Sequence, residues 1–189
     1  MKLPIALLAF LFVAGCGKLE TSPRPSFAIF AEFAKNANIP MKNGLNRRVF
    51  NTVEAQSGSD IALEKDGSIA LRPGTYRING FSIATMQAKL TPPASHYNTN
   101  YPGYCVVYER DFEANDPLHH QIGIGSPSTA REMTPSLFDL VFTCTKVTHL
   151  CVGHQSGDAL NSEVYLSVYD VGGITSPFHV FARIAVFKL

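Results

Sequence analysis

Residues 75–90 alternate between two faces, and a repeat of two residues is the signature of a β-strand. Tyr76 and the following even-numbered positions form one face, while the odd-numbered positions form the other. Pro73 and Gly74 directly precede this stretch, and the pair predicts a type II turn, because proline presets one backbone angle and glycine accepts the positive φ that this turn type requires at the next position. The pattern therefore predicts a short strand, a tight turn and then a long strand at the centre of a β-sandwich sheet.

Further apolar stretches predict that the rest of the chain is also all-β. Residues 26–34 fit a strand or a helical stripe, and we favour the strand because so short a helix without a clear cap is weak. Other predicted strands lie at residues 47–53, 61–64, 104–111, 121–124, 136–147, 148–154, 161–170 and 178–189. The segments 136–147 and 148–154 are predicted to form a hairpin. The last segment is almost continuously apolar, which is typical of a strand buried on both faces.

Length and charge narrow the class of protein. The chain has 189 residues, which is enough for one domain with a sizeable core. Its formal net charge is +1, so it lacks the basic excess that neutralises phosphates, and nucleic acid is not an expected partner. We find no internal repeat and no second domain.

The N-terminus carries an export signal. Lys2 precedes an apolar stretch at residues 5–13 that is too short to span a bilayer. The segment Val-Ala-Gly-Cys that ends at Cys16 resembles the bacterial lipobox, in which the cysteine is lipidated and becomes the new N-terminus. An ordinary signal peptide that happens to contain a cysteine is the alternative. We expect a signal peptide at residues 1–15, and a lipidated Cys16 and tether at residues 16–25.

This address predicts a membrane partner. Several acyl chains on Cys16 would anchor the protein stably, whereas one chain alone is marginal. Gly17, rather than aspartate, follows the cysteine. In a Gram-negative cell the lipoprotein sorting pattern then favours the outer membrane.

The order of short motifs resembles the jelly-roll domain shared by tumour necrosis factor (TNF) and the globular head of the first complement component. The motifs are a Phe-rich strand, Asn-Ile-Pro, Val-Phe-Asn, Gly-Ser-Ile-Ala-Leu, Pro-Gly-Thr-Tyr and an apolar last strand, at residues 27–33, 38–40, 49–51, 67–71, 73–76 and 180–189. Residues 48–52 and 71–76 also resemble segments of the C-terminal domains of phage tail fibres. The resemblance covers residues 26–189.

That resemblance implies a jelly-roll β-sandwich of about ten strands that forms a homotrimer, with one face of each sandwich packed around a three-fold axis. Phe81 and Ile83 fall on the face of the long strand opposite Tyr76, where a solvated face would be polar. They indicate either a subunit interface or ordinary packing within one chain.

Three cysteines remain beyond Cys16. Export makes a disulfide plausible, and a hairpin turn at residues 147–148 would place Cys144 opposite Cys151, close enough to bridge. The alternative is that these cysteines are buried and reduced. Cys105 is then the unpaired cysteine.

No catalytic or metal-binding constellation stands out. His119 and His120 would point to opposite faces of a strand, and the remaining histidines lack ligands at metal-binding spacing. Neither glycine-bearing segment, at residues 123–126 and 153–157, has the context of a phosphate loop or a nucleophile elbow. The acidic residues of 111–116 fit either a cation-binding loop or a solvated one. We therefore expect no cofactor and no enzymatic activity.

The loop at residues 97–104 is the best binding candidate, because tyrosines and asparagines suit a sugar or a protein surface. The candidate ligand-binding residues are Tyr97, Asn98, Asn100, Tyr101 and Tyr104. The alternative is that the tyrosines close one end of the barrel. The leading hypothesis is a trimeric lipoprotein for recognition or assembly at the cell envelope. A carbohydrate-binding surface lipoprotein is the second hypothesis, and an enzyme is the third.

Overall fold

The computed structural model describes residues 25–33, 38–86, 102–110, 120–156, 164–167, 170–171, 174–175 and 180–189. The predicted signal peptide, Cys16 and most of the tether lie outside these ranges. Among the described residues, no helix has the length and apolar character needed to cross a bilayer.

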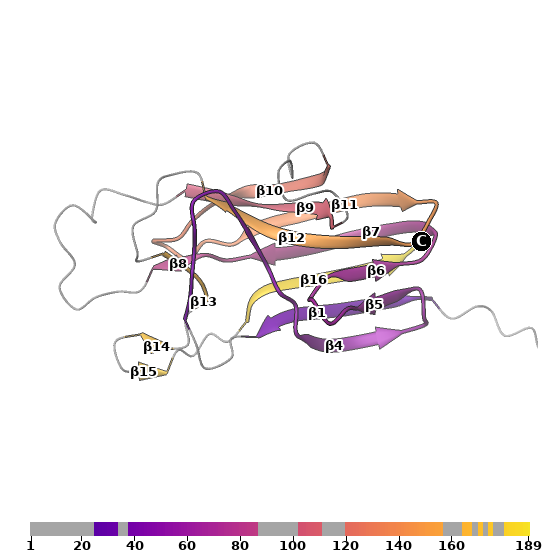
Figure 1. The fold of residues 1–189 in the computed structure, drawn as a ribbon, viewed down its shortest axis with the longest axis horizontal. Helices are drawn as coiled ribbons and strands as arrows, with labels where there is room; N and C mark the ends of the chain where they lie inside the picture. The colour runs from indigo at the N-terminus through magenta and orange to yellow at the C-terminus, as the bar shows by residue number, and fades with distance from the viewer. Residues whose placement is uncertain are drawn as a thin grey trace, which may run out of the picture.

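Two antiparallel sheets form the body of a β-sandwich (Figure 1). The first sheet has the strand order β11 (Ser136–Cys144), β7 (Gly74–Ser82), β16 (Val180–Lys188), β1 (Phe27–Phe33) and β4 (Thr52–Ser57). The second has the order β10 (Gln121–Thr129), β9 (Pro102–Glu109), β12 (Thr148–Ser156), β6 (Ile69–Leu71) and β5 (Ile61–Leu63), with β3 (Leu45–Arg47) also paired to β12. Apolar side chains from both sheets meet in one core cluster.

Short strands lie near the end of the sandwich opposite the C-terminus (Figure 1). A three-stranded sheet there has the order β2 (Ile39–Pro40), β13 (Val164–Ser167) and β8 (Thr85–Met86). The remaining pair is β14 (Asp170–Val171) with β15 (Ile174–Thr175). The predicted all-β jelly-roll class is confirmed.

The central strands β7 and β16 of the first sheet bury one face. In β7, Tyr76 and Ile78 are fully buried while Arg77 between them is exposed, as the alternation predicts. In β16, Ile184 faces the core, but Phe187 remains 37% exposed. The expectation that the last strand is buried on both faces was wrong, because Arg183 and Phe187 point outward from the sheet and are exposed.

The long strand is shorter than predicted, since β7 ends at Ser82. Ile83 leaves the sheet: its N–H donates to the Phe181 carbonyl at 2.8 Å, and its own carbonyl accepts from the Arg48 guanidinium. Strand β8 then joins the three-stranded sheet, and residues 87–101 lie outside the described residues. The predicted strand at 47–53 is also divided, because the chain passes from β3 to β4 through Arg48.

The chain crosses repeatedly between the two sheets, and two of these crossings correct predictions made from the sequence. Strand β6 is in the second sheet and β7 is in the first. Gly74 has a φ of 158°, close to extended backbone, so the predicted type II turn is not formed. The chain likewise crosses after β11, which pairs with β7, to β12, which pairs with β9. The predicted hairpin was wrong, because each of its strands has a different neighbour.

The cysteine positions follow from these crossings. Cys144 lies opposite Gly74 on β7, whereas Cys151 lies opposite Tyr108 on β9. Both are buried free thiols, as is Cys105. The disulfide expected between Cys144 and Cys151 is absent from the structure, because the register that would have joined them does not exist.

Candidate functional site

The outer face of the five-stranded sheet is the candidate interaction surface. Three successive rows of its outward side chains run across the strands. Read from β11 toward β4, the rows are Leu137, Phe81, Arg183 and Ala31; Asp139, Asn79, Ala185, Ile29 and Ala55; and Val141, Arg77, Phe187, Phe27 and Ser57. Leu137 and Val141 are 56% and 62% exposed. Exposed apolar side chains that are grouped in this way mark interaction sites.

A shallow hollow of about 580 Å³ lies within the first two rows. Leu137 and Phe81 give it apolar walls, and Asn79 and Asp139 give it polar ones. Ala185 also lines it, and this short side chain leaves room between its larger neighbours. The hollow suits a protruding apolar side chain from a partner.

Two ion pairs lie on the same outer face. The Arg77 guanidinium donates to both carboxylate oxygens of Asp139, through Nε at 3.1 Å and Nη2 at 2.7 Å. Arg183 Nη2 contacts Glu54 Oε1 at 2.7 Å. The hydrogen bond from Arg77 lowers the pKa of the Asp139 carboxyl below its usual range. The Arg77, Asp139 and Arg183 side chains are each about half exposed.

The two residues predicted for a subunit interface lie in different places. Phe81 is in the first row of the outer face, beside Leu137 and Arg183. Ile83 is beyond the end of β7 and packs against Phe181 in a separate small cluster with Met133. The alternation of 75–90 placed both on one face, but the chain leaves the sheet between them.

A chain of buried polar groups joins the two sheets inside the sandwich. Arg48, which is 0% exposed, donates from Nε to Ser82 Oγ at 2.9 Å and from Nη1 to the Leu166 carbonyl at 2.6 Å. Its Nη1 also lies 3.5 Å from the carboxylate of Glu32 on β1. Burial raises the pKa of Glu32 and lowers the pKa of Arg48, and their mutual attraction opposes both shifts.

His154 on β12 continues this chain. Its Nδ1 lies 2.8 Å from Ser82 Oγ, and its Nε2 lies 3.4 Å from Ser128 Oγ on β10. We assign Nδ1 as the acceptor and Nε2–H as the donor, because this tautomer uses the Ser82 hydroxyl proton and leaves Ser128 Oγ to donate to the Gly103 carbonyl at 3.2 Å. Burial, with a smaller effect of the Arg48 charge, lowers the pKa of His154 to about 3.

This network of buried polar side chains has a structural role. A neutral histidine between two hydroxyl groups resembles part of a catalytic relay, but Ser82, Ser128 and His154 are all buried. A nucleophile must reach substrate. Gly103 adds a packing constraint, since a Cβ there would lie 2.9 Å from His154 Nε2. The polar chain therefore fixes the spacing of the sheets.

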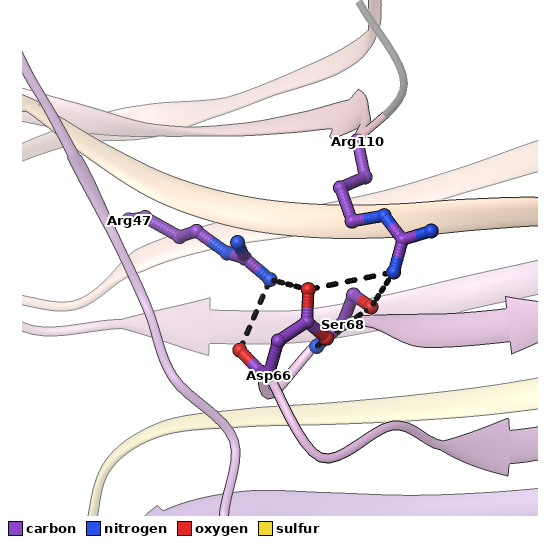
Figure 2. A network of polar contacts seen from close by, with 4 residues as sticks. All are labelled: Arg47, Asp66, Ser68 and Arg110. Atoms are coloured by element: carbon purple, nitrogen blue, oxygen red, sulfur yellow. Dashed lines mark hydrogen bonds and ion pairs between the residues drawn. The ribbon is translucent and has the colours of Figure 1, made fainter. Parts of the chain in front are cut away.

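A second polar cluster lies at the turn between β5 and β6 (Figure 2). Figure 2 shows Arg47 and Arg110 converging on one carboxylate, that of Asp66, at 3.0 and 3.4 Å. The same carboxylate accepts from Ser68 Oγ at 2.6 Å. The hydrogen bond from Ser68, followed by others from its backbone and from Arg47, lowers the pKa of Asp66. The cluster ties the turn to β3 and β9.

Most of the other predicted site residues fall outside the described residues. These are Cys16, Tyr97, Asn98, Asn100, Tyr101 and His119, together with the acidic loop at 111–116. Tyr104 is described and is half-buried near the start of β9. Within the described ranges, no group of three histidine, cysteine or acidic side chains is placed to hold a metal ion.

The buried network of Arg48, Ser82 and His154 was not predicted from the sequence. Arg48 lies between the half-buried Arg47 and the exposed Val49, so no local signal marked it as a buried charge. His154 was considered only as a metal ligand. Arg48 and His154 are 106 residues apart in the sequence, and no local pattern indicates that they lie close together.

Comparison with known proteins identifies the fold. No known protein family and no curated protein sequence matches the chain. Among solved structures, murine APRIL at pH 8.0 aligns with a TM-score of 0.52 at 10% identity, over 88% of this chain and 100% of that one. Eiger TNF from S. frugiperda aligns with a TM-score of 0.50 at 11% identity, over 88% and 94%. This chain has a TNF-like jelly-roll fold. At such low identity the likeness extends to the fold alone.

Proposed function

We propose that this protein is a lipid-anchored, trimeric jelly-roll protein that acts in recognition or assembly at the cell envelope and is not an enzyme. The observation that carries the proposal is the outer face of the five-stranded sheet. Leu137 and Val141 are more than half exposed there, although the sandwich buries the opposite face of the same strands. A TNF-like fold and a homotrimer built on one face of each sandwich agree with this surface.

The direction of the strands supports an anchored orientation. The described chain enters β1 at the end of the sandwich that carries the C-terminus (Figure 1). A hydrogen bond of 2.9 Å from Lys188 N to the Ser26 carbonyl ties the two termini of the domain together. A tether from Cys16 would reach the domain at this end.

The opposite end would then face away from the membrane. Strand β8 and the beginning of β9 lie there (Figure 1), and residues 87–101 connect these two strands. Tyr104, close to the start of β9, is half-buried. We place recognition at this end, through the aromatic and asparagine side chains of residues 97–104.

A glycan is the second candidate ligand, because Tyr104 is only half-buried near the start of β9 and tyrosines suit a sugar surface. A glycan array probed with the full chain in detergent separates the two hypotheses. Reproducible signals that disappear in Tyr104→Ala would support a lectin. A uniformly blank array would leave protein recognition or assembly as the function.

Native mass spectrometry of the full chain, released from detergent micelles, tests the trimer and the anchor together. We expect three subunits per particle and a mass increase on each subunit from acyl chains on Cys16. Cys16→Ala should remove that increase and leave the signal peptide uncleaved. A strict monomer at micromolar concentration would overturn the trimer, and an unmodified Cys16 would overturn the anchor.

A further inference from the structure

We propose that the ion pairs Arg77–Asp139 and Glu54–Arg183 neutralise the outer face within each subunit, so that a second copy of this chain can cover it without burying an unpaired charge. This inference rests on the trimer proposed above.

The first pair lies among the apolar residues of the face. Arg77 is directly opposite Val141 on β11 and Phe187 on β16. Asp139 is one row away, so the pair runs diagonally between β7 and β11. Its two-pronged geometry, at 3.1 and 2.7 Å, uses both carboxylate oxygens. Such a pair satisfies both groups before any partner arrives.

The second pair depends on a local irregularity of β4. The pairing of β1 with β4 shifts register, since Ile29 is opposite Ala55 whereas Phe30 is opposite Val53. Glu54 is the extra residue, and a bulge of this kind redirects a side chain. It allows Glu54 to reach across β1 and contact Arg183 on β16 at 2.7 Å.

The burial of Ala31 indicates where the Arg183–Glu54 ion pair crosses β1. It lies on β1 directly between Arg183 and Thr52 of the flanking strands, and its neighbours Phe30 and Glu32 point into the sandwich. Ala31 therefore points outward, yet it is 0% exposed. This burial agrees with the Arg183–Glu54 ion pair passing over Ala31 from β16 to β4.

The face therefore has no net charge among its described residues, with two arginines balanced by Asp139 and Glu54. This suits a second copy of the same chain, because a uniformly charged face would repel its own duplicate. An exposed ion pair contributes little to the stability of a single subunit. Removing one member becomes costly only when the face is covered, because the other charge is then buried without a partner.

The test is the trimer dissociation constant of the full chain, measured by native mass spectrometry over a dilution series. Asp139→Asn and Glu54→Gln are nearly isosteric and should each raise the constant at least a hundredfold. At protein concentrations well below the trimer dissociation constant, the thermal unfolding temperature of each variant should stay close to that of the wild type. The matched control is Asp66→Asn, which removes an exposed carboxylate from arginines on the other sheet and should leave the constant unchanged.

A charge exchange completes the design. Arg77→Asp combined with Asp139→Arg should restore association to within tenfold of the wild type, while Arg77→Asp alone should abolish it. If the wild type is a trimer and Asp139→Asn and Glu54→Gln associate as tightly, the inference fails and the trimer stands. A monomeric wild type would overturn the proposed trimer and this inference with it.

Discussion

Ser82 Oγ lies 2.8 Å from His154 Nδ1, and this contact joins β7 of one sheet to β12 of the other inside the sandwich. The same hydroxyl accepts from Arg48 Nε at 2.9 Å. Ser82 is thus the link between a buried cation and a buried neutral imidazole. Its removal would leave both neighbours without a partner at this point.

Ser82→Ala should therefore lower the free energy of unfolding by about 2–4 kcal/mol, since a stranded buried donor or acceptor costs roughly 1–3 kcal/mol each. Urea denaturation monitored by circular dichroism measures this change. Ser128→Ala provides the comparison, because its contact with His154 is longer at 3.4 Å and its loss should cost less. A larger loss in Ser128→Ala would contradict the assigned order of the chain.

The stability of the protein should fall as the pH drops from about 6.5 to about 3, because His154 has a folded pKa of about 3 against an ordinary value of 6.5. Between these two pH values His154 is protonated in the unfolded chain but stays neutral in the folded protein. Within that range His154 contributes a loss of up to about 1.4 kcal/mol per pH unit.

The raised pKa of Glu32 acts in the opposite direction, so the histidine must be isolated by a variant. The difference in unfolding free energy between wild type and His154→Gln, measured at pH 7 and at pH 5, gives its contribution. The wild type should lose more stability than the variant over this interval. Equal losses in the two proteins would contradict the buried neutral imidazole.

The Arg48–Glu32 pair should show strong coupling. Arg48→Met leaves the Glu32 carboxylate buried without its cation and should cost about 3–5 kcal/mol at pH 7. The double variant Arg48→Met with Glu32→Leu removes both charges and should recover part of that loss. Chemical denaturation of the four proteins of this cycle yields the coupling energy, and strictly additive losses would disprove the interaction.

The three described cysteines should remain protected thiols. Burial raises the pKa of Cys105 and of Cys151, so neither should react with iodoacetamide in the native protein at pH 8. After denaturation without a reductant, mass spectrometry should find all three described cysteines alkylated. Alkylation of Cys105 alone would show that Cys144 and Cys151 form a disulfide after all.

The sequence predicted those parts of the fold that local patterns encode. Alternation across Tyr76, Arg77 and Ile78 identified β7 and its buried face correctly. Pairing partners were harder, because apolar strands joined by a short turn can form a hairpin or cross between sheets. Nothing in the residues 144–148 distinguishes the two, and Cys144 and Cys151 were consequently placed in one hairpin.

In the candidate site, too, locally encoded features could be predicted and long-range contacts could not. Phe81 could be identified as an apolar residue on an outward face, since that property depends on its own strand. Ile83 could not be separated from it, because the chain leaves the sheet through contacts with Phe181 and Arg48. The Glu54 bulge and the contact of Arg48 with Ser82 depend on strand register and on long-range packing, which the sequence does not display.

In the proposed trimer the outer face of the five-stranded sheet joins the subunits, and Leu137→Asp is the most direct test of this contact. Leu137 is 56% exposed, so the substitution should leave the fold of one subunit intact. Native mass spectrometry of the full chain should find trimers for the wild type and monomers for Leu137→Asp, with matching circular dichroism spectra. A Leu137→Asp protein that remains trimeric at the wild-type dissociation constant would show that this face does not join the subunits.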